Sequence, residues 1–176
     1  DRINVFPVPD GDTGTNLAST LSGAIAATVP AAAAAATLGS LAEASILSAR
    51  GNSGVIFAQF VSGLSEAVAD AEMRTGDFAA GVRRAYLRAR SAVSEPRDGT
   101  ILSVIEDWAA SLARRVHEAA TFAELIGGTR EDLRRSLAGT TERLPALKNA
   151  GVVDAGAAGF VEFVEGAHDY LINGLG

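Results

Sequence analysis

Residues 4–16 constrain this chain more than any other stretch, because they disfavour a helix and gather acidic and small side chains. They read Asn-Val-Phe-Pro-Val-Pro-Asp-Gly-Asp-Thr-Gly-Thr-Asn. Pro7 and Pro9 lack N–H groups and favour extended geometry in the residues before them. Asp10 and Asp12 follow at a spacing of two, which in an extended segment puts both carboxylates on the same side. We therefore expect an acidic loop at this position.

The two carboxylates of this loop need a positive partner, and residues 4–16 contain no lysine or arginine. A hard divalent cation with oxygen ligands, Mg²⁺ or Ca²⁺, suits Asp10 and Asp12. The EF-hand calcium loop does not fit, because its later ligand positions are not matched. The alternative is an ordinary Asp/Gly turn in which Asp12, Thr13 or Thr15 caps the next helix.

The whole string resembles the signature of the DhaL-type kinase domain. That domain binds ATP in dihydroxyacetone kinases and forms the amino-terminal part of bacterial fatty-acid kinases (FakA-like proteins). Three later strings resemble the family in the same order: Ala49-Arg50-Gly51-Asn52-Ser53-Gly54, Asp98-Gly99-Thr100 and Gly151-Val152-Val153-Asp154-Ala155-Gly156. Together the four strings span the chain. Pro-Val-Pro and Ala-Arg-Gly-Asn-Ser-Gly favour the fatty-acid kinase branch.

Composition excludes several classes of protein. A formal net charge of −6 and a pI near 4.9 argue against nucleic-acid binding. Lys148 is the single lysine, so both the P-loop and the protein-kinase lysine are excluded. The chain has no cysteine and no signal-peptide pattern, which fits a cytoplasmic protein. The uncharged stretch 21–42 is alanine-rich and contains Pro30 and Gly39, so it predicts two soluble helices and no transmembrane segment.

The chain favours an all-α fold, because alanine is frequent and no run alternates β-branched residues. The expected helices cover about 16–28, 40–49, 53–69, 100–119, 130–144 and 157–172, with a further helix capped by Asp77. Ser40 and Glu43 predict a capping box, as do Thr121 and Glu124, whose short segment is interrupted by Gly127-Gly128. Short loops indicate an up-and-down bundle. We expect residues 1–176 to be a single domain.

The resemblance implies an antiparallel helical barrel or bundle of about eight helices, with ATP in the loops at one end. It also implies a protein that extends beyond this chain, with a first helix upstream and further domains downstream. FakA-like proteins carry such domains, so we expect the chain alone to be weakly active or inactive. A homodimer through those other domains is left open.

The resemblance assigns site residues by their place in the four strings. Asp10 and Asp12 would be catalytic ligands of one or two Mg²⁺ ions, with Asn4 where the dihydroxyacetone branch has a third aspartate. The expected nucleotide and phosphate contacts are Thr13, Gly14, Asn16, Gly51, Asn52, Ser53, Gly54, Thr100, Asp154, Ala155 and Gly156.

Several residues of these strings have a simpler alternative role. Asn52, Ser53 and Thr100 could be ordinary helix caps, although N–H groups at a helix start also form an anion site. Arg50 could stabilise a transferred phosphate or end a helix in solvent. His117 and His168 lie in helix-periodic stretches and are expected to have surface or core roles.

Four functions remain open. The first is an Mg²⁺·ATP kinase domain that phosphorylates a fatty-acid carboxylate presented by a FakB-like acyl-binding protein. The second is a dihydroxyacetone (glycerone) kinase, which needs a partner subunit to hold its substrate. The third is a nucleotide or metal sensor without turnover, and the fourth is a helical interaction scaffold.

Overall fold

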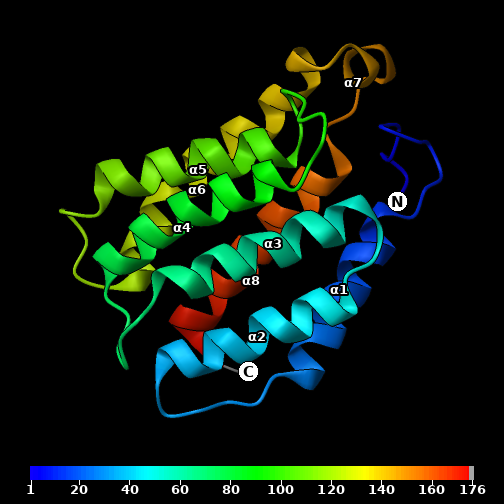
Figure 1. The fold of residues 1–176 in the computed structure, drawn as a ribbon. Coiled ribbons are helices and arrows are strands. Elements are labelled where there is room, and N and C mark those ends of the chain that lie inside the picture. The colour runs from blue at the N-terminus through cyan, green and yellow to red at the C-terminus, as the bar shows by residue number, and fades with distance from the viewer. Residues whose placement is uncertain (175–176) are drawn as a thin grey trace.

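The computed structural model describes residues 1–174, and these residues form eight α-helices and no strand (Figure 1). The prediction of an all-α fold is confirmed. The helices are α1 (Thr13–Ala27), α2 (Ala34–Ser48), α3 (Gly51–Ala67), α4 (Thr75–Ser91), α5 (Ile101–Arg115), α6 (Phe122–Arg143), α7 (Pro145–Ala150) and α8 (Ala155–Asn173).

Seven of these helices close a ring. Each helix from α1 to α6 packs against the next, α6 packs against α8, and α8 returns to α1. The short α7 lies against α6 and links it to α8. Successive ring helices run in opposite directions, so α1, α3, α5 and α8 all begin at the end where the N-terminal segment, the α4–α5 loop and α7 lie (Figure 1). The expected antiparallel barrel is confirmed.

Aromatic side chains fill the middle of the ring. Phe160 of α8 is fully buried and meets Phe60 of α3 and Trp108 of α5 edge-to-face, at ring-centroid distances of 5.3 and 5.6 Å. The Trp108 indole N–H donates a 2.9 Å hydrogen bond to Thr129 Oγ1 of α6, so the buried donor is satisfied. These contacts fix the positions of α3, α5, α6 and α8 relative to one another.

The second helix begins earlier than the sequence pattern predicts. α2 starts at Ala34, so the predicted start at Ser40 is wrong. The alanines before Ser40 are the strongest helix formers, and they extend the helix toward the N-terminus. Ser40 Oγ instead accepts a 2.8 Å hydrogen bond from the Val29 N–H and ties the end of α1 to the middle of α2.

The capping box of Thr121 and Glu124 is confirmed, but the predicted break at Gly127-Gly128 is wrong. Helix α6 continues through both glycines to Arg143. A Cβ on Gly127 would lie 2.8 Å from His168 Nε2, so this glycine lets α8 approach α6 closely. Other predicted bounds also shift: α5 ends at Arg115, and Asp77 lies inside α4, where it accepts a hydrogen bond from the Arg74 N–H.

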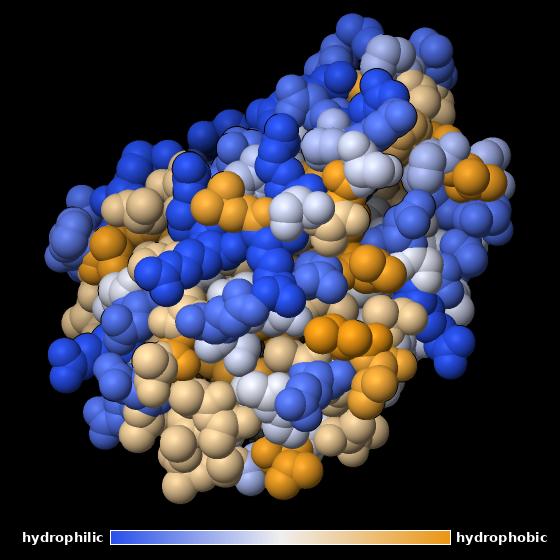
Figure 2. All heavy atoms as spheres, in the orientation of Figure 1, coloured by the Kyte–Doolittle hydropathy of each residue, from blue (hydrophilic) through white to orange (hydrophobic). Residues whose placement is uncertain are grey.

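The surface is divided between charged and uncharged helices. Glu43 is the one charged side chain in residues 13–49, which include all of α1 and α2. Figure 2 shows hydrophilic residues gathered over α4 and α5 and hydrophobic ones over α1 and α2. In residues 1–174, no helix is long and apolar enough to cross a membrane.

Candidate functional site

A cavity of about 740 Å³ opens at the end of the ring where α1, α3, α5 and α8 begin. This volume lies within the range of about 300–1,000 Å³ that is typical of small-molecule sites. The N-terminal segment, the α4–α5 loop and Leu144 complete its wall. The sequence-predicted residues that line it are Asn4, Asp10, Asp12, Thr13, Asn16, Gly51, Asn52, Ser53, Thr100, Asp154 and Gly156.

The N-terminal segment is held against the cavity by Asn4. Its side chain is 5% exposed, and its amide donates a 2.6 Å hydrogen bond to Asp10 Oδ1. A carboxylate only accepts, so the amide nitrogen faces Asp10 and the carbonyl oxygen of Asn4 is turned away. That oxygen is buried and has no hydrogen-bond partner within residues 1–174. Asn4 therefore orients one carboxylate, and its carbonyl oxygen is left as a buried acceptor without a hydrogen bond.

Asp10 and Asp12 are both exposed and line the same cavity. The segment between them is not extended, because Gly11 adopts a left-handed conformation with φ 68°. Glycine takes this conformation without steric cost. The backbone turns at Gly11, and both carboxylates still reach the same space.

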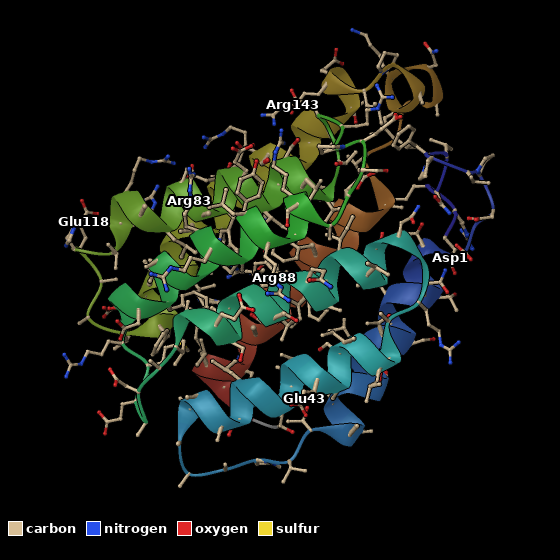
Figure 3. All side chains as sticks on the ribbon, in the orientation of Figure 1. Asp1, Glu43, Arg83, Arg88, Glu118 and Arg143 are labelled. Atoms are coloured by element: carbon tan, nitrogen blue, oxygen red, sulfur yellow. The ribbon has the colours of Figure 1, made fainter. Side chains whose placement is uncertain are left out.

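Asp12 stands at the N-cap position of α1, but its side chain makes no capping hydrogen bond. Asp1 fills that role: its carboxylate accepts hydrogen bonds from the Thr15 N–H at 3.0 Å and from the Thr15 hydroxyl at 2.7 Å. Figure 3 shows Asp1 beside the start of α1. The Asp12 carboxylate is therefore not used by the helix and remains free for another partner.

Helix α3 begins without any side-chain cap. Gly51 has φ 61° and lies against Asn16 of α1, where a Cβ would come 2.7 Å from the Asn16 amide nitrogen. Asn52 and Ser53 follow on the cavity wall, and no side chain accepts hydrogen bonds from their backbone N–H groups in residues 1–174. Free N–H groups at the positive end of a helix dipole favour an anion.

Helices α5 and α8 begin beside each other and share one carboxylate. Asp154 is 6% exposed, and its Oδ2 accepts hydrogen bonds from the Ala157 N–H at 2.8 Å and the Ile101 N–H at 3.0 Å. The Asp154 N–H donates in turn to Thr140 Oγ1 of α6. Burial raises the pKa of Asp154 to about 6, although hydrogen bonds from backbone N–H groups act in the opposite direction.

Three of the predicted contact residues do not line the cavity. Gly14 lies against Asp1, and a Cβ there would meet Asp1 Oδ1 at 3.0 Å. Gly54 is buried against Thr20 of α1, where it permits close packing of α1 and α3. Ala155 is the first residue of α8 and is not among the lining residues. These residues position the wall without forming it.

The four strings therefore meet at one end of the barrel. A comparison with known protein families identifies the family to which this helical barrel belongs. The family model described as the DAK2 domain matches residues 7–169. The chain belongs to the DAK2 domain family. The DAK2 domain is a dihydroxyacetone-kinase-like domain, which associates this chain with nucleotide binding and kinase function.

Several bacterial proteins are similar in sequence to this chain. Protein YloV of Bacillus subtilis is 38% identical over 169 residues, covering 94% of this chain and 31% of YloV. An uncharacterized MG369 homolog of Mycoplasma pneumoniae is 36% identical over 176 residues, covering 94% of this chain and 32% of the relative. The uncharacterized protein SSP1546 of Staphylococcus saprophyticus is 37% identical over 166 residues, covering 90% and 29%. The chain thus spans about a third of the length of these relatives.

The residues of the DAK2 domain fit a magnesium ion held together with phosphate. Two exposed carboxylates and the unpartnered carbonyl oxygen of Asn4 supply the oxygen donors that Mg²⁺ prefers. Residues 1–174 contain no cluster of three or more His, Cys, Asp or Glu side chains that could hold a metal. Mg²⁺ usually completes its coordination shell with phosphate oxygens and water. Two carboxylates therefore suit Mg²⁺ better than a coordination shell made entirely of protein ligands.

Sequence reasoning did not single out part of the DAK2 cavity wall. Arg97 lines it beside Glu95, with which it forms a 2.8 Å ion pair. Its position directly before Asp98-Gly99-Thr100 was the available signal. Apolar side chains also line the cavity: Phe6, Val8, Val55, Ile56, Val93, Leu102 and Leu144. They lie near one another only in the folded chain, so no local pattern marks them as a group.

Other candidates lie away from the cavity. His168 is buried in α8 against Gly127, and His117 is exposed just after α5. Lys148 of α7 is exposed and pairs with Glu142. Thr100 lines the cavity as the N-cap residue of α5, but its hydroxyl donates to the Arg97 carbonyl. Arg50 is exposed and lies outside the lining set.

Proposed function

We propose that this DAK2 domain binds Mg²⁺·ATP and transfers the γ-phosphate to an acceptor. One observation carries the proposal: Asp10 and Asp12 line the same cavity as the uncapped start of α3. Phosphoryl transfer depends mostly on positioning and on neutralising charge at the phosphate oxygens. Two carboxylates for the metal and one helix start for phosphate are the parts that such a reaction needs.

Each group of the cavity has a role in this proposal. Asp10, Asp12 and the carbonyl oxygen of Asn4 would hold Mg²⁺, and the hydrogen bond from Asn4 would orient Asp10. Bound Mg²⁺ would neutralise charge that builds up on the phosphate oxygens. The N–H groups of Asn52 and Ser53 would bind phosphate oxygens at the start of α3, joined by the Ser53 and Thr13 hydroxyls. The nucleoside would lie along the apolar wall.

We further propose that the acceptor is a fatty-acid carboxylate presented by a separate acyl-binding protein of the FakB type. The likeness of residues 4–16 and 49–54 to the fatty-acid kinase branch supports this acceptor. Val8 and Val55 line the cavity and are 57% and 44% exposed, so the rim offers apolar surface to an incoming protein. A carboxylate oxygen would bond to the γ-phosphorus as the bond to the β–γ bridging oxygen breaks, giving acyl phosphate and ADP.

Calorimetric titration of ATP, with Mg²⁺ and then with a chelator, tests the nucleotide part of the proposal. Binding that requires the metal is the expected result. Equal binding in both conditions would remove the metal role from Asp10 and Asp12. The absence of binding in both would favour a helical scaffold.

Phosphorylation assays with radiolabelled ATP test the acceptor. The full-length protein should label a fatty acid only when an acyl-binding partner is supplied. Labelling of dihydroxyacetone with its partner subunit, and not of fatty acid, would reassign the acceptor to the second branch. ATP binding without any transfer to either acceptor would indicate a sensor.

A further inference from the structure

Asp154 differs from the other acidic residues of the cavity wall in being buried. Asp10, Asp12 and Glu95 are exposed, whereas Asp154 is 6% exposed. Its Oδ2 joins the starts of α5 and α8, because it accepts hydrogen bonds from the N–H of Ile101, 53 residues earlier in the sequence, and from the N–H of Ala157. No lysine or arginine forms an ion pair with it in residues 1–174. Backbone N–H groups and helix dipoles are therefore the partners of this charge.

The carboxylate stands where an external anion would otherwise bind. Anions bind at helix starts because free N–H groups and the positive dipole end point at them. At the adjoining starts of α5 and α8, Asp154 already accepts from one N–H of each helix. The charge remains mostly ionised at neutral pH, because the pKa of Asp154, raised by burial, reaches only about 6. A phosphate at this position would meet a negative charge and N–H groups that are already bonded.

The neighbouring start of α3, unlike those of α5 and α8, has no carboxylate in residues 1–174 bonded to its N–H groups. Its first turn has no side-chain cap, and Asn52 and Ser53 line the cavity. Ser53 packs directly on Gly156 of α8, where a Cβ would come 2.6 Å from the Ser53 hydroxyl oxygen. The uncapped start of α3 is thus an immediate neighbour of the starts of α5 and α8, which Asp154 already occupies. Asp1 likewise occupies the start of α1 through Thr15.

We propose that Asp154 is a positioning residue whose carboxylate fills the anion position between the starts of α5 and α8, and thereby directs the phosphates of the bound nucleotide to the start of α3, beside Asp10 and Asp12. This inference rests on the proposed function. It assigns Asp154 no contact with substrate. Its role is to leave one productive place for phosphate where three helix starts meet.

Three variants separate the parts of this role. Asp154→Ser keeps an N-cap oxygen for α8 but is too short to reach Ile101, so it frees the start of α5. Asp154→Asn removes the charge, and its single carbonyl oxygen can retain both hydrogen bonds, because both go to one carboxylate oxygen. Thr140→Val is the matched control, since it removes the hydrogen bond from the Asp154 N–H and leaves the carboxylate intact.

The experiment follows backbone amide signals by NMR while inorganic phosphate, and separately Mg²⁺·ATP, is added. In the wild-type protein we expect both probes to shift the amides of Asn52 and Ser53 and to leave those of Ile101 and Ala157 in place. In Asp154→Ser, phosphate should also shift the Ile101 amide and bind about two- to fivefold more tightly, the range of a helix-dipole contribution. Asp154→Asn should bind phosphate more tightly with the Ile101 amide still bonded. Thr140→Val should behave as the wild type.

Two results would overturn the inference. One is a phosphate response of Ile101 and Ala157 in the wild-type protein. The other is a folded Asp154→Ser or Asp154→Asn protein whose phosphate response matches that of the wild type or of Thr140→Val. If the Asn52 and Ser53 amides of the wild type ignore Mg²⁺·ATP, the proposed function fails instead, and the gain at Ile101 still decides the role of Asp154.

Discussion

The side-chain amide nitrogen of Asn4 lies 2.6 Å from Asp10 Oδ1. With the nitrogen in this contact, the carbonyl oxygen of Asn4 is buried and has no hydrogen-bond partner in residues 1–174. An orphaned buried acceptor is costly in a folded protein. A metal ion beside Asp10 would satisfy it once the Asn4 side chain turned this oxygen toward Asp10.

The Asn4→Asp variant tests this pairing. It replaces a hydrogen bond with two facing carboxylates, so we expect the free energy of unfolding without metal to fall by about 1–3 kcal/mol. Mg²⁺ should raise the melting temperature of the variant more than that of the wild type, because a third carboxylate strengthens the site. Thermal melts with and without Mg²⁺ measure both effects. Equal responses to Mg²⁺ would argue against a metal at Asn4.

The Asp12→Asn variant separates ligand binding from stability. The Asp12 side chain is exposed and makes no capping hydrogen bond, so the unfolding free energy should change by less than about 0.5 kcal/mol. Mg²⁺-dependent ATP binding should be lost in calorimetry. Glu95→Gln is the matched control, because Glu95 is another exposed acid on the cavity wall. If both variants weakened binding equally, Asp12 would contribute only general charge.

The contact between Gly156 and Ser53 predicts strong coupling. Gly156→Ala would place a Cβ 2.6 Å from Ser53 Oγ, so we expect a loss of about 1–3 kcal/mol in unfolding free energy. Ser53→Ala removes that oxygen and should restore part of the loss in the double variant. Urea unfolding of the four proteins gives the coupling energy. Additive effects would mean that the starts of α3 and α8 do not touch in solution.

The adjacent glycines of α6 should respond to alanine with opposite signs. Gly128→Ala meets only Arg115 Cδ at 3.5 Å, so it should stabilise the protein by about 0.5–1 kcal/mol through helix propensity. Gly127→Ala would come 2.8 Å from His168 Nε2 and should destabilise it. Chemical denaturation followed by Trp108 fluorescence measures both. Stabilisation by both substitutions would show that α8 does not lie close to Gly127.

Asp154 gives a pH dependence with a definite sign. Burial raises the pKa of Asp154 from 3.8 to about 6, so the folded state holds the proton more tightly than the unfolded state does. The stability from this group is present below about pH 4 and is lost as the pH rises through 6. Asp154→Asn has no such loss, so between pH 4 and 7 its stability relative to the wild type should improve by roughly 2–3 kcal/mol. Urea titrations at both pH values test this, and a constant difference would contradict it.

The sequence predicts much of this fold and places the four strings at helix starts, because capping, glycine and proline signals are local. Thr121 and Glu124 behave as their spacing indicates. Gly127-Gly128 does not, because the reason for these glycines is His168, which lies on another helix. A glycine that permits close packing and a glycine that ends a helix look alike in sequence.

The sequence predicts which residues gather at the candidate site. It does not predict which of them are buried and which are exposed to a ligand. Asp10 and Asp154 both stand in recognisable strings, yet one is exposed and the other buried. Burial of Asp154 depends on α5, α6 and α8 meeting around it, through Ile101, Ala157 and Thr140. Such a contact joins distant segments, so spacing within one string cannot reveal it.

Because the cavity draws its wall from the first residues of α1, α3, α5 and α8, a molecule bound there connects segments from Asp10 to Gly156. Any opening that separates these helix starts would then release the bound molecule. Occupancy at 100 times the dissociation constant would add about 2.7 kcal/mol to the free energy of unfolding, shared by the entire barrel. Ligand binding and cooperative unfolding are in this way linked equilibria. Slower hydrogen exchange of amides in α6, far from the cavity, would then report that the cavity is occupied.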